Sequence, residues 1–189
     1  MKKLFTLFLT FAMFLVFSGI TDAQKKNAVK INMFSPIVKT FSGFYERALS
    51  DGASAQLGFF YTGYKVEDTK FSGWGLTPEF RLYPGKKEDL AGFYLAPFFR
   101  YSSFSLETPT IDPQTSQEID GKATLSTIGG GLLIGGQFLF GDIVTLDLYI
   151  GPKYGASDIT VDAGQEDDFS LGSFDGFGVR GGVTIGIAF

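Results

Sequence analysis

The sequence contains neither cysteine nor histidine among its 189 residues. Without cysteine the chain cannot form a disulfide framework, and it cannot be a bacterial lipoprotein anchored through a lipidated N-terminal cysteine. Without histidine it lacks the usual base for activating a serine nucleophile and the usual protein ligand of zinc. The commonest forms of hydrolytic catalysis therefore find no support in the composition.

Long apolar runs are also scarce. One of them, residues 4–17, follows two lysines and precedes a small-residue end at positions 21–23, which is the pattern of a secretory signal peptide. This run is shorter than the ~20 residues that a spanning helix needs, so a retained membrane anchor is the less favoured interpretation. We predict that residues 1–23 are a cleaved signal peptide and that residues 24–189 form a single outer-membrane β-barrel domain.

Acidic residues outnumber basic ones. The chain has 20 Asp and Glu against 16 Lys and Arg, and residues 1–23 contain two of the lysines and one of the aspartates. The mature chain then carries 14 basic and 19 acidic residues, a net charge of about −5. This balance gives no reason to expect a nucleic acid as a partner.

What the sequence does contain is clearest in residues 175–189, where large apolar side chains alternate with small or polar ones. The large set comprises Phe177, Val179, Val183, Ile185, Ile187 and Phe189. A period of two indicates a β-strand with one apolar face. In an outer-membrane barrel such a face points to lipid, and the small polar face points to the lumen.

Comparable strand-like segments recur along the mature chain. We predict eight of them, at residues 29–34, 40–49, 53–66, 73–83, 91–106, 122–140, 144–154 and 175–189. Their connections alternate: the second, fourth and sixth are short, whereas the third, fifth and seventh are longer, at residues 67–72, 107–121 and 155–174. The first is predicted as a short turn at Pro36. This layout predicts an all-β fold, an eight-stranded antiparallel up-and-down transmembrane β-barrel with both termini in the periplasm.

Outward-facing apolar rows leave a set of charged side chains for the lumen. By alternation this set comprises Glu46, Glu79, Arg81, Arg100, Asp147 and Arg180. Eight strands enclose an interior that side chains fill, and charges in such a space must be paired and hydrogen-bonded. We interpret the three acids and three bases as a neutral network that fills the lumen. The alternative is a selective pore or a proton path.

A cluster of acidic residues falls in the last predicted loop. Asp158, Asp162, Glu166 and Asp168 are weak candidates for a calcium site, because Ca²⁺ binds six to eight oxygen ligands. Their spacing does not fit an EF-hand, and a solvated surface loop is the favoured interpretation. We therefore predict no metal and no cofactor.

Catalysis is the least favoured class of function. A glycosidase pair formed by Glu79 and Asp147 is formally possible, but neighbouring arginines would hold both carboxylates ionised, whereas such an enzyme needs one acid protonated. The glycines at 129–131 and 135–136 do not match the spacing of nucleotide-binding loops. We predict that the protein is not an enzyme.

Several segments also resemble a family of small, functionally uncharacterised outer-membrane barrel proteins of Bacteroidota. They are residues 27–32, 45–49, 78–84, 93–98, 178–180 and 186–189. The more general likeness is to small barrels such as OmpX and the membrane domain of OmpA. The resemblance implies an eight-stranded barrel and supplies no catalytic residues. The last three residues, ending at Phe189, are similar to the signal read by the barrel-insertion machinery, although Thr184 stands where that signal usually has glycine.

The leading functional hypothesis is an integral protein of the bacterial outer membrane with a structural or surface-interaction role. Its partners would be the lipid bilayer, the insertion machinery and an extracellular loop partner that the sequence does not name. The first alternative is a narrow channel for ions or small solutes. The second is a soluble, lipocalin-like barrel that binds an apolar ligand, which would require the opposite facing of the strands.

Overall fold

A computed structural model describes residues 25–66, 68–84, 90–111, 118–161 and 176–189. The predicted signal peptide, residues 1–23, lies outside the described residues. Within them, no helix is both long enough and apolar enough to cross a membrane.

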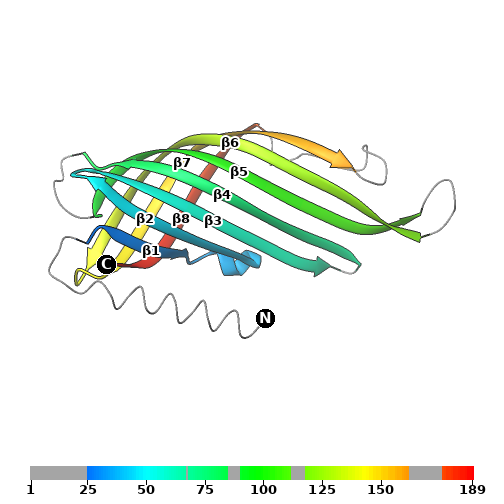
Figure 1. Cartoon of the computed structure of the whole chain (residues 1–189), viewed down its shortest axis with the longest axis horizontal. Coiled ribbons are helices and arrows are strands. Elements are labelled where there is room, and N and C mark those ends of the chain that lie inside the picture. The colour runs from blue at the N-terminus through cyan, green and yellow to red at the C-terminus, as the bar shows by residue number, and fades with distance from the viewer. Residues whose placement is uncertain (1–24, 67, 85–89, 112–117, 162–175) are drawn as a thin grey trace.

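The described chain forms a closed barrel in which each strand pairs with its sequence neighbours and β8 pairs with β1 (Figure 1). All eight pairings are antiparallel. The strands are β1 (Asn27–Asn32), β2 (Thr40–Ser50), β3 (Ala53–Val66), β4 (Thr69–Leu82), β5 (Gly92–Ile111), β6 (Glu118–Phe140), β7 (Val144–Val161) and β8 (Gly176–Ala188). The predicted fold of eight up-and-down strands is confirmed.

The first and last strands meet at one end of the barrel, which we call the terminal end. The backbone N–H of Asn27 donates to the carbonyl of Phe189 over 3.0 Å, and the N–H of Phe189 donates to the carbonyl of Asn27 over 2.8 Å. The β2–β3 and β6–β7 turns lie at this end too (Figure 1). We call the opposite end, toward which β5 and β6 extend furthest, the far end.

Two of the terminal-end turns are as tight as predicted. Gly52 has a φ of 86°, and Gly141 and Asp142 both have positive φ values, of 57° and 59°. Two consecutive residues with positive φ are the signature of a type I′ turn, whose twist matches that of the flanking strands. Glycine adopts this conformation without steric cost, which is why the sequence marks these turns clearly.

The far-end connections differ from the prediction, because the strands are longer than expected. The prediction of a loop at residues 67–72 is wrong, because β3 continues to Val66 and β4 already begins at Thr69. The predicted loops at 107–121 and 155–174 are likewise shortened, since β5 and β6 pair through residues 107–111 and 118–122 and β7 continues to Val161. The polar residues at these positions pair across strands; Glu107, for example, stands opposite both Lys70 and Lys122.

The first connection is also not a simple turn. Residues Ser35–Val38 form a short 3₁₀ helix, η1, with Pro36 in its first turn. The side-chain oxygen of Asn32 accepts hydrogen bonds from the backbone N–H groups of Phe34 and Ser35, at 2.8 and 3.2 Å. This arrangement satisfies two donors that the end of β1 leaves free, and it places η1 at the mouth of the lumen.

The facing of the strands agrees with the alternation in the sequence. Every strand carries at least one large apolar side chain that is exposed on the outside, for example Val29, Phe41, Leu57, Trp74, Leu95, Ile134, Leu148 and Ile187. The residues on the opposite face of each strand point inward, and many of those are polar or charged and fully buried. The barrel is therefore apolar outside and polar inside.

Candidate functional site

Six charged side chains form a continuous ion-paired cluster across the lumen, which we call the charged belt. It comprises Lys30, Glu46, Glu79, Arg81, Asp147 and Arg180. The belt is neutral, with three acids and three bases, and every member is less than 9% exposed. Five different strands, β1, β2, β4, β7 and β8, supply these residues.

Arg81 is the centre of the belt. Its Nη1 lies 2.8 Å from Asp147 Oδ2 and 3.4 Å from Glu46 Oε2, and its Nη2 lies 3.2 Å from Glu79 Oε2. A planar guanidinium can engage several carboxylates at once because its five N–H donors point in fixed directions. Its face lies over the ring of Tyr94, with 4.3 Å to the ring centroid.

Lys30 is the belt residue that the sequence analysis left out. Its Nζ lies 2.5 Å from Glu46 Oε2 and 3.3 Å from Asp147 Oδ2, and it donates to Gln137 Oε1 over 2.6 Å. The alternation of the strand contains the signal that could have found it, because Lys30 stands between Val29 and Ile31, whose apolar side chains are exposed on the outer face.

Uncharged side chains complete the hydrogen bonding of the carboxylates. Tyr83 and Ser54 both donate to Glu46 Oε1, at 2.7 and 2.5 Å, and Tyr94 donates to Asp147 Oδ1 over 2.8 Å. Gln56 donates to Glu79 Oε2 over 3.0 Å. With these residues and Gln137, strands β3, β5 and β6 join the network, so all eight strands contribute to it. Such complete pairing is what makes buried charge tolerable.

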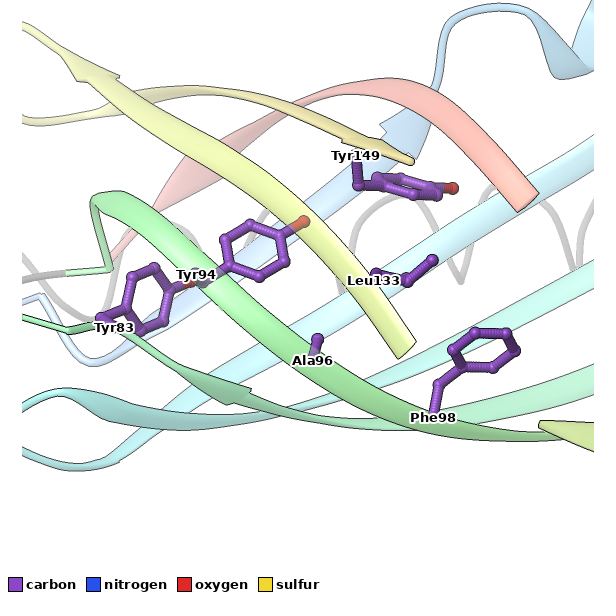
Figure 2. Packing of buried hydrophobic residues seen from close by; sticks show 6 residues of the cluster. All are labelled: Tyr83, Tyr94, Ala96, Phe98, Leu133 and Tyr149. Carbon is purple, nitrogen blue, oxygen red and sulfur yellow. The ribbon is translucent and has the colours of Figure 1, made fainter. Parts of the chain in front are cut away.

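Aromatic rings fill the space around the belt. Figure 2 shows Tyr83 and Tyr94 at one end of a row of buried side chains, Phe98 at the other, and Leu133 and Tyr149 between them. The guanidinium of Arg180 lies over the rings of Phe98 and Tyr149, at 4.6 and 5.3 Å from their centroids. The rings leave little room for water beside the ion pairs.

Apolar side chains pack between the belt and the terminal end. Leu90, from the β4–β5 connection, is 2% exposed and packs with Ala28 and Ala188. The side-chain amide of Gln137 donates to the backbone carbonyl of Leu90, which ties this apolar cluster to the belt. The described residues thus form a floor of apolar and paired side chains across the barrel.

Arg100 lies outside this network, contrary to the expected arrangement of three acids and three bases. Among the described residues, no carboxylate lies within 4 Å of its guanidinium, which instead lies over the ring of Phe60 at 4.5 Å from the centroid. The neutrality that was predicted holds for the belt only because Lys30 takes the place that Arg100 was expected to fill.

A cavity of about 440 Å³ lies on the far side of the belt. Arg100, Arg180 and Tyr149 line it, together with polar residues of η1 and β2 and with aromatic residues of β2 to β5. Its lining residues on β1, β2, β4 and β7 are each nearer the far end than the belt residues on the same strands. The lumen is therefore divided into a packed half and a hollow half.

Of the four acidic residues predicted as weak calcium candidates, the structure describes only Asp158. Asp158 is in β7 opposite Ser126, exposed on the outer face, rather than in a loop. Backbone pairing continues β7 through this position, although the apolar alternation of its sequence has ended. Asp162, Glu166 and Asp168 lie outside the described residues. Among the described residues, no group of three or more carboxylates is arranged to hold a metal ion.

Comparison with known proteins bears on the fold and on the family. Residues 6–160 match the model of the family described as "Protein of unknown function (DUF3575)". The chain belongs to this family. No curated protein matches the sequence. Family membership therefore brings no activity with it, and what the protein does has to be argued from the lumen and the surface.

The solved structures that resemble this chain in fold include an outer membrane protein and a β-barrel domain. A major outer membrane protein of Thermus thermophilus has 13% identity and a TM-score of 0.51, over 87% of this chain and 98% of that one. Acinetobacter baumannii CarO has 11% identity and a TM-score of 0.44, covering 88% and 98%. The N-terminal barrel domain of Pseudomonas aeruginosa OprF has 15% identity and a TM-score of 0.38, also covering 88% and 98%. At 13% identity, the likeness to the Thermus protein concerns the fold alone.

Proposed function

We propose that this protein is an integral outer-membrane barrel with a sealed lumen, which acts as a structural or surface-interaction protein and not as an enzyme. The observation that carries the proposal is the division of side chains by face. Phe93 and Phe177 are 80% and 87% exposed on the outside, whereas Arg81, Glu46 and Asp147 are 0% exposed inside. So many exposed apolar side chains around a barrel are unusual on a soluble protein, and they are expected where the outer face contacts lipid.

The same facing argues against a soluble, lipocalin-like barrel. A soluble barrel needs polar residues on its outer face, whereas here the outer face is apolar and the charged side chains of the belt are buried in the lumen. The test is fractionation of cell membranes followed by a carbonate wash. An integral barrel stays with the membrane pellet, and release into the wash would contradict the proposal.

The proposed orientation places the terminal end in the periplasm and the far end outside the cell. It is supported by the position of both described ends beside the tight turns, since outer-membrane barrels have short periplasmic turns and longer extracellular connections. Protease added to whole cells should then cleave at the β5–β6 connection near residue 111 and not at the β6–β7 turn near Asp142. The reverse pattern of cleavage would contradict the orientation.

The proposal of a sealed lumen distinguishes this protein from a narrow channel. Side chains from every strand contribute to the belt and its hydrogen-bonding partners, and every carboxylate oxygen of the belt has a protein donor. In planar bilayers the purified barrel should show no steady single-channel steps, whereas a porin reconstituted by the same procedure should show them. Steady, ion-selective steps would favour the channel.

We also propose that strand β8, with Phe189 after it, is the part that the insertion machinery reads. A Phe189→Ser variant should reach the outer membrane at a lower level in cells and yet refold in detergent micelles as the unaltered chain does. A matched Phe177→Ser variant, at the far end of the same strand, should be assembled normally. Equal assembly of both variants would contradict this partner.

A further inference from the structure

The hollow half of the lumen has an unbalanced lining. Arg100 and Arg180 both line the cavity, and no acidic side chain lies among its described lining residues. Hydroxyl groups of Ser42, Thr62 and Thr77 lie on the same walls. Such a lining offers donors for hydrogen bonds and positive charge, but no carboxylate to neutralise it.

Within the described chain, the acid that pairs with one of these arginines is already fully engaged. Glu79 Oε1 accepts from Arg180 Nη2 over 2.7 Å, while its Oε2 accepts from Arg81 and Gln56 at 3.2 and 3.0 Å. Arg180 is 8% exposed, and its Nη1 is buried with no hydrogen-bond partner among the described residues. Because this atom is itself covered, the positive charge that the cavity offers without a neutralising carboxylate is that of Arg100, and Arg180 adds a cation that is already paired with Glu79.

A row of aromatic rings leads from Arg100 toward the far end. Phe60, beneath the guanidinium, lies 5.8 Å from Phe104, which lies 5.7 Å from Phe71, which in turn lies 5.1 Å from the ring of Tyr64, measured between ring centroids. All four residues line the cavity. They form an apolar wall that ends at a positive charge.

Glycines of β4 allow two of these rings to lie against the strand. A Cβ atom at Gly73 would approach the ring of Phe104 to 2.2 Å, and one at Gly75 would approach the ring of Phe60 to 2.2 Å. Because β4 has no side chains at these two inward positions, the rings lie against the strand. The centre of the lumen stays open there, whereas at the belt it is filled.

We propose that the cavity binds a small organic carboxylate with a flat apolar body, the carboxylate at Arg100 and Arg180 and the body against the aromatic row. A volume of about 440 Å³ is in the range of small-molecule pockets. The inference rests on the proposed sealed barrel, because the charged belt forms the floor of the site. The hollow half of the lumen has room for this ligand, whereas the packed half does not.

The test is isothermal titration calorimetry of the barrel purified from membranes, with 2-naphthoate as the probe and detergent micelles alone as the blank. We expect 2-naphthoate to bind at least about tenfold more tightly than 2-naphthamide, which has the same shape without the charge. Acetate, which has the charge without the rings, should also bind about tenfold or more weakly. Equal binding of naphthoate and naphthamide, or tighter binding of inorganic phosphate, would overturn the proposal.

Variants locate the site. Arg100→Gln should weaken 2-naphthoate binding about tenfold, because it removes the cation without breaking an ion pair of the belt. Arg47→Gln, an equal change of charge at an exposed position of β2, should bind as the unaltered chain does. Retained heat-resistant migration in gels shows that each variant is folded. Unchanged binding by Arg100→Gln would overturn the proposal, and this result is independent of whether the barrel conducts ions.

Discussion

Two inward-facing arginines, Arg81 and Arg100, stand on neighbouring strands and have opposite surroundings. Arg81 is within 3.4 Å of three carboxylates and is fully buried, whereas Arg100 faces an aromatic ring and an open cavity. Where carboxylates surround the guanidinium, its charge serves to hold the barrel together. Where they are missing, the same side chain is available to a ligand. Substitutions in the two halves of the lumen should therefore differ in how much stability they remove.

Replacing Arg81 should have the largest effect. Arg81→Met leaves three buried carboxylates with only Lys30 and Arg180, so we expect the free energy of unfolding to fall by about 3–5 kcal/mol. Urea titration of the refolded barrel in detergent micelles measures it. Arg47→Met, at an exposed position, should change it by no more than about 0.5 kcal/mol. Similar losses for the two variants would mean that the belt does not stabilise the barrel.

The pair of Lys30 and Glu46 should show strong coupling. Lys30→Met and Glu46→Gln each leave one charge of the belt unmatched, while the double variant removes both and restores neutrality. In the same titration the double variant should be more stable than the sum of the single changes predicts, by about 2 kcal/mol. Simple additivity would contradict the assignment of Lys30 to the belt.

Removing one hydroxyl should have an intermediate effect. Tyr94→Phe keeps the ring beneath Arg81 and takes away the donor to Asp147, so a loss of about 1.5 kcal/mol is expected. Tyr61→Phe is the matched change on the outer face, and it should have almost no effect on the midpoint of unfolding. A stability unchanged by Tyr94→Phe would show that water or another donor replaces the hydroxyl.

Arg100→Gln should have the smallest effect on stability. It loses only the contact with the ring of Phe60, for which a cost of less than about 1 kcal/mol is expected. Thermal unfolding followed by circular dichroism, with Arg81→Gln measured beside it, makes the comparison direct. Equal losses of stability in the two variants would mean that Arg100 stabilises the barrel as much as Arg81 does, which would contradict the contrast between the two halves of the lumen.

The sequence predicted the number of strands and their facing, because a period of two is visible wherever one face meets an apolar environment and the other does not. It predicted the ends of the strands poorly at the far end. Beyond Tyr101 and Tyr154 both faces of β5 and β7 carry polar residues, so the alternation fades although the backbone pairing continues. Strand pairing needs only backbone groups and a partner, which composition does not reveal.

The sequence predicted which charged side chains point into the lumen, but not which of them lie within ion-pairing distance of one another. Alternation places Arg81, Arg100 and Arg180 on the inside, yet which of them meets a carboxylate depends on the stagger between strands. Glu79 stands opposite Phe98 of β5, two residues away from Arg100, while Arg180 reaches Glu79 from the other side of the lumen. Contacts across a closed barrel join residues far apart in sequence, and no local pattern encodes them.

The two hydrogen bonds between Asn27 and Phe189 have a consequence for biogenesis. Until β8 has arrived, β1 presents a row of unpaired backbone groups and invites association with any other extended chain. Because this joint connects the two ends of the described sheet, it closes the largest loop of the eight pairings and has the largest chain-entropy cost. The exposed edges of β1 and β8 are therefore protected only once the two strands have paired with each other.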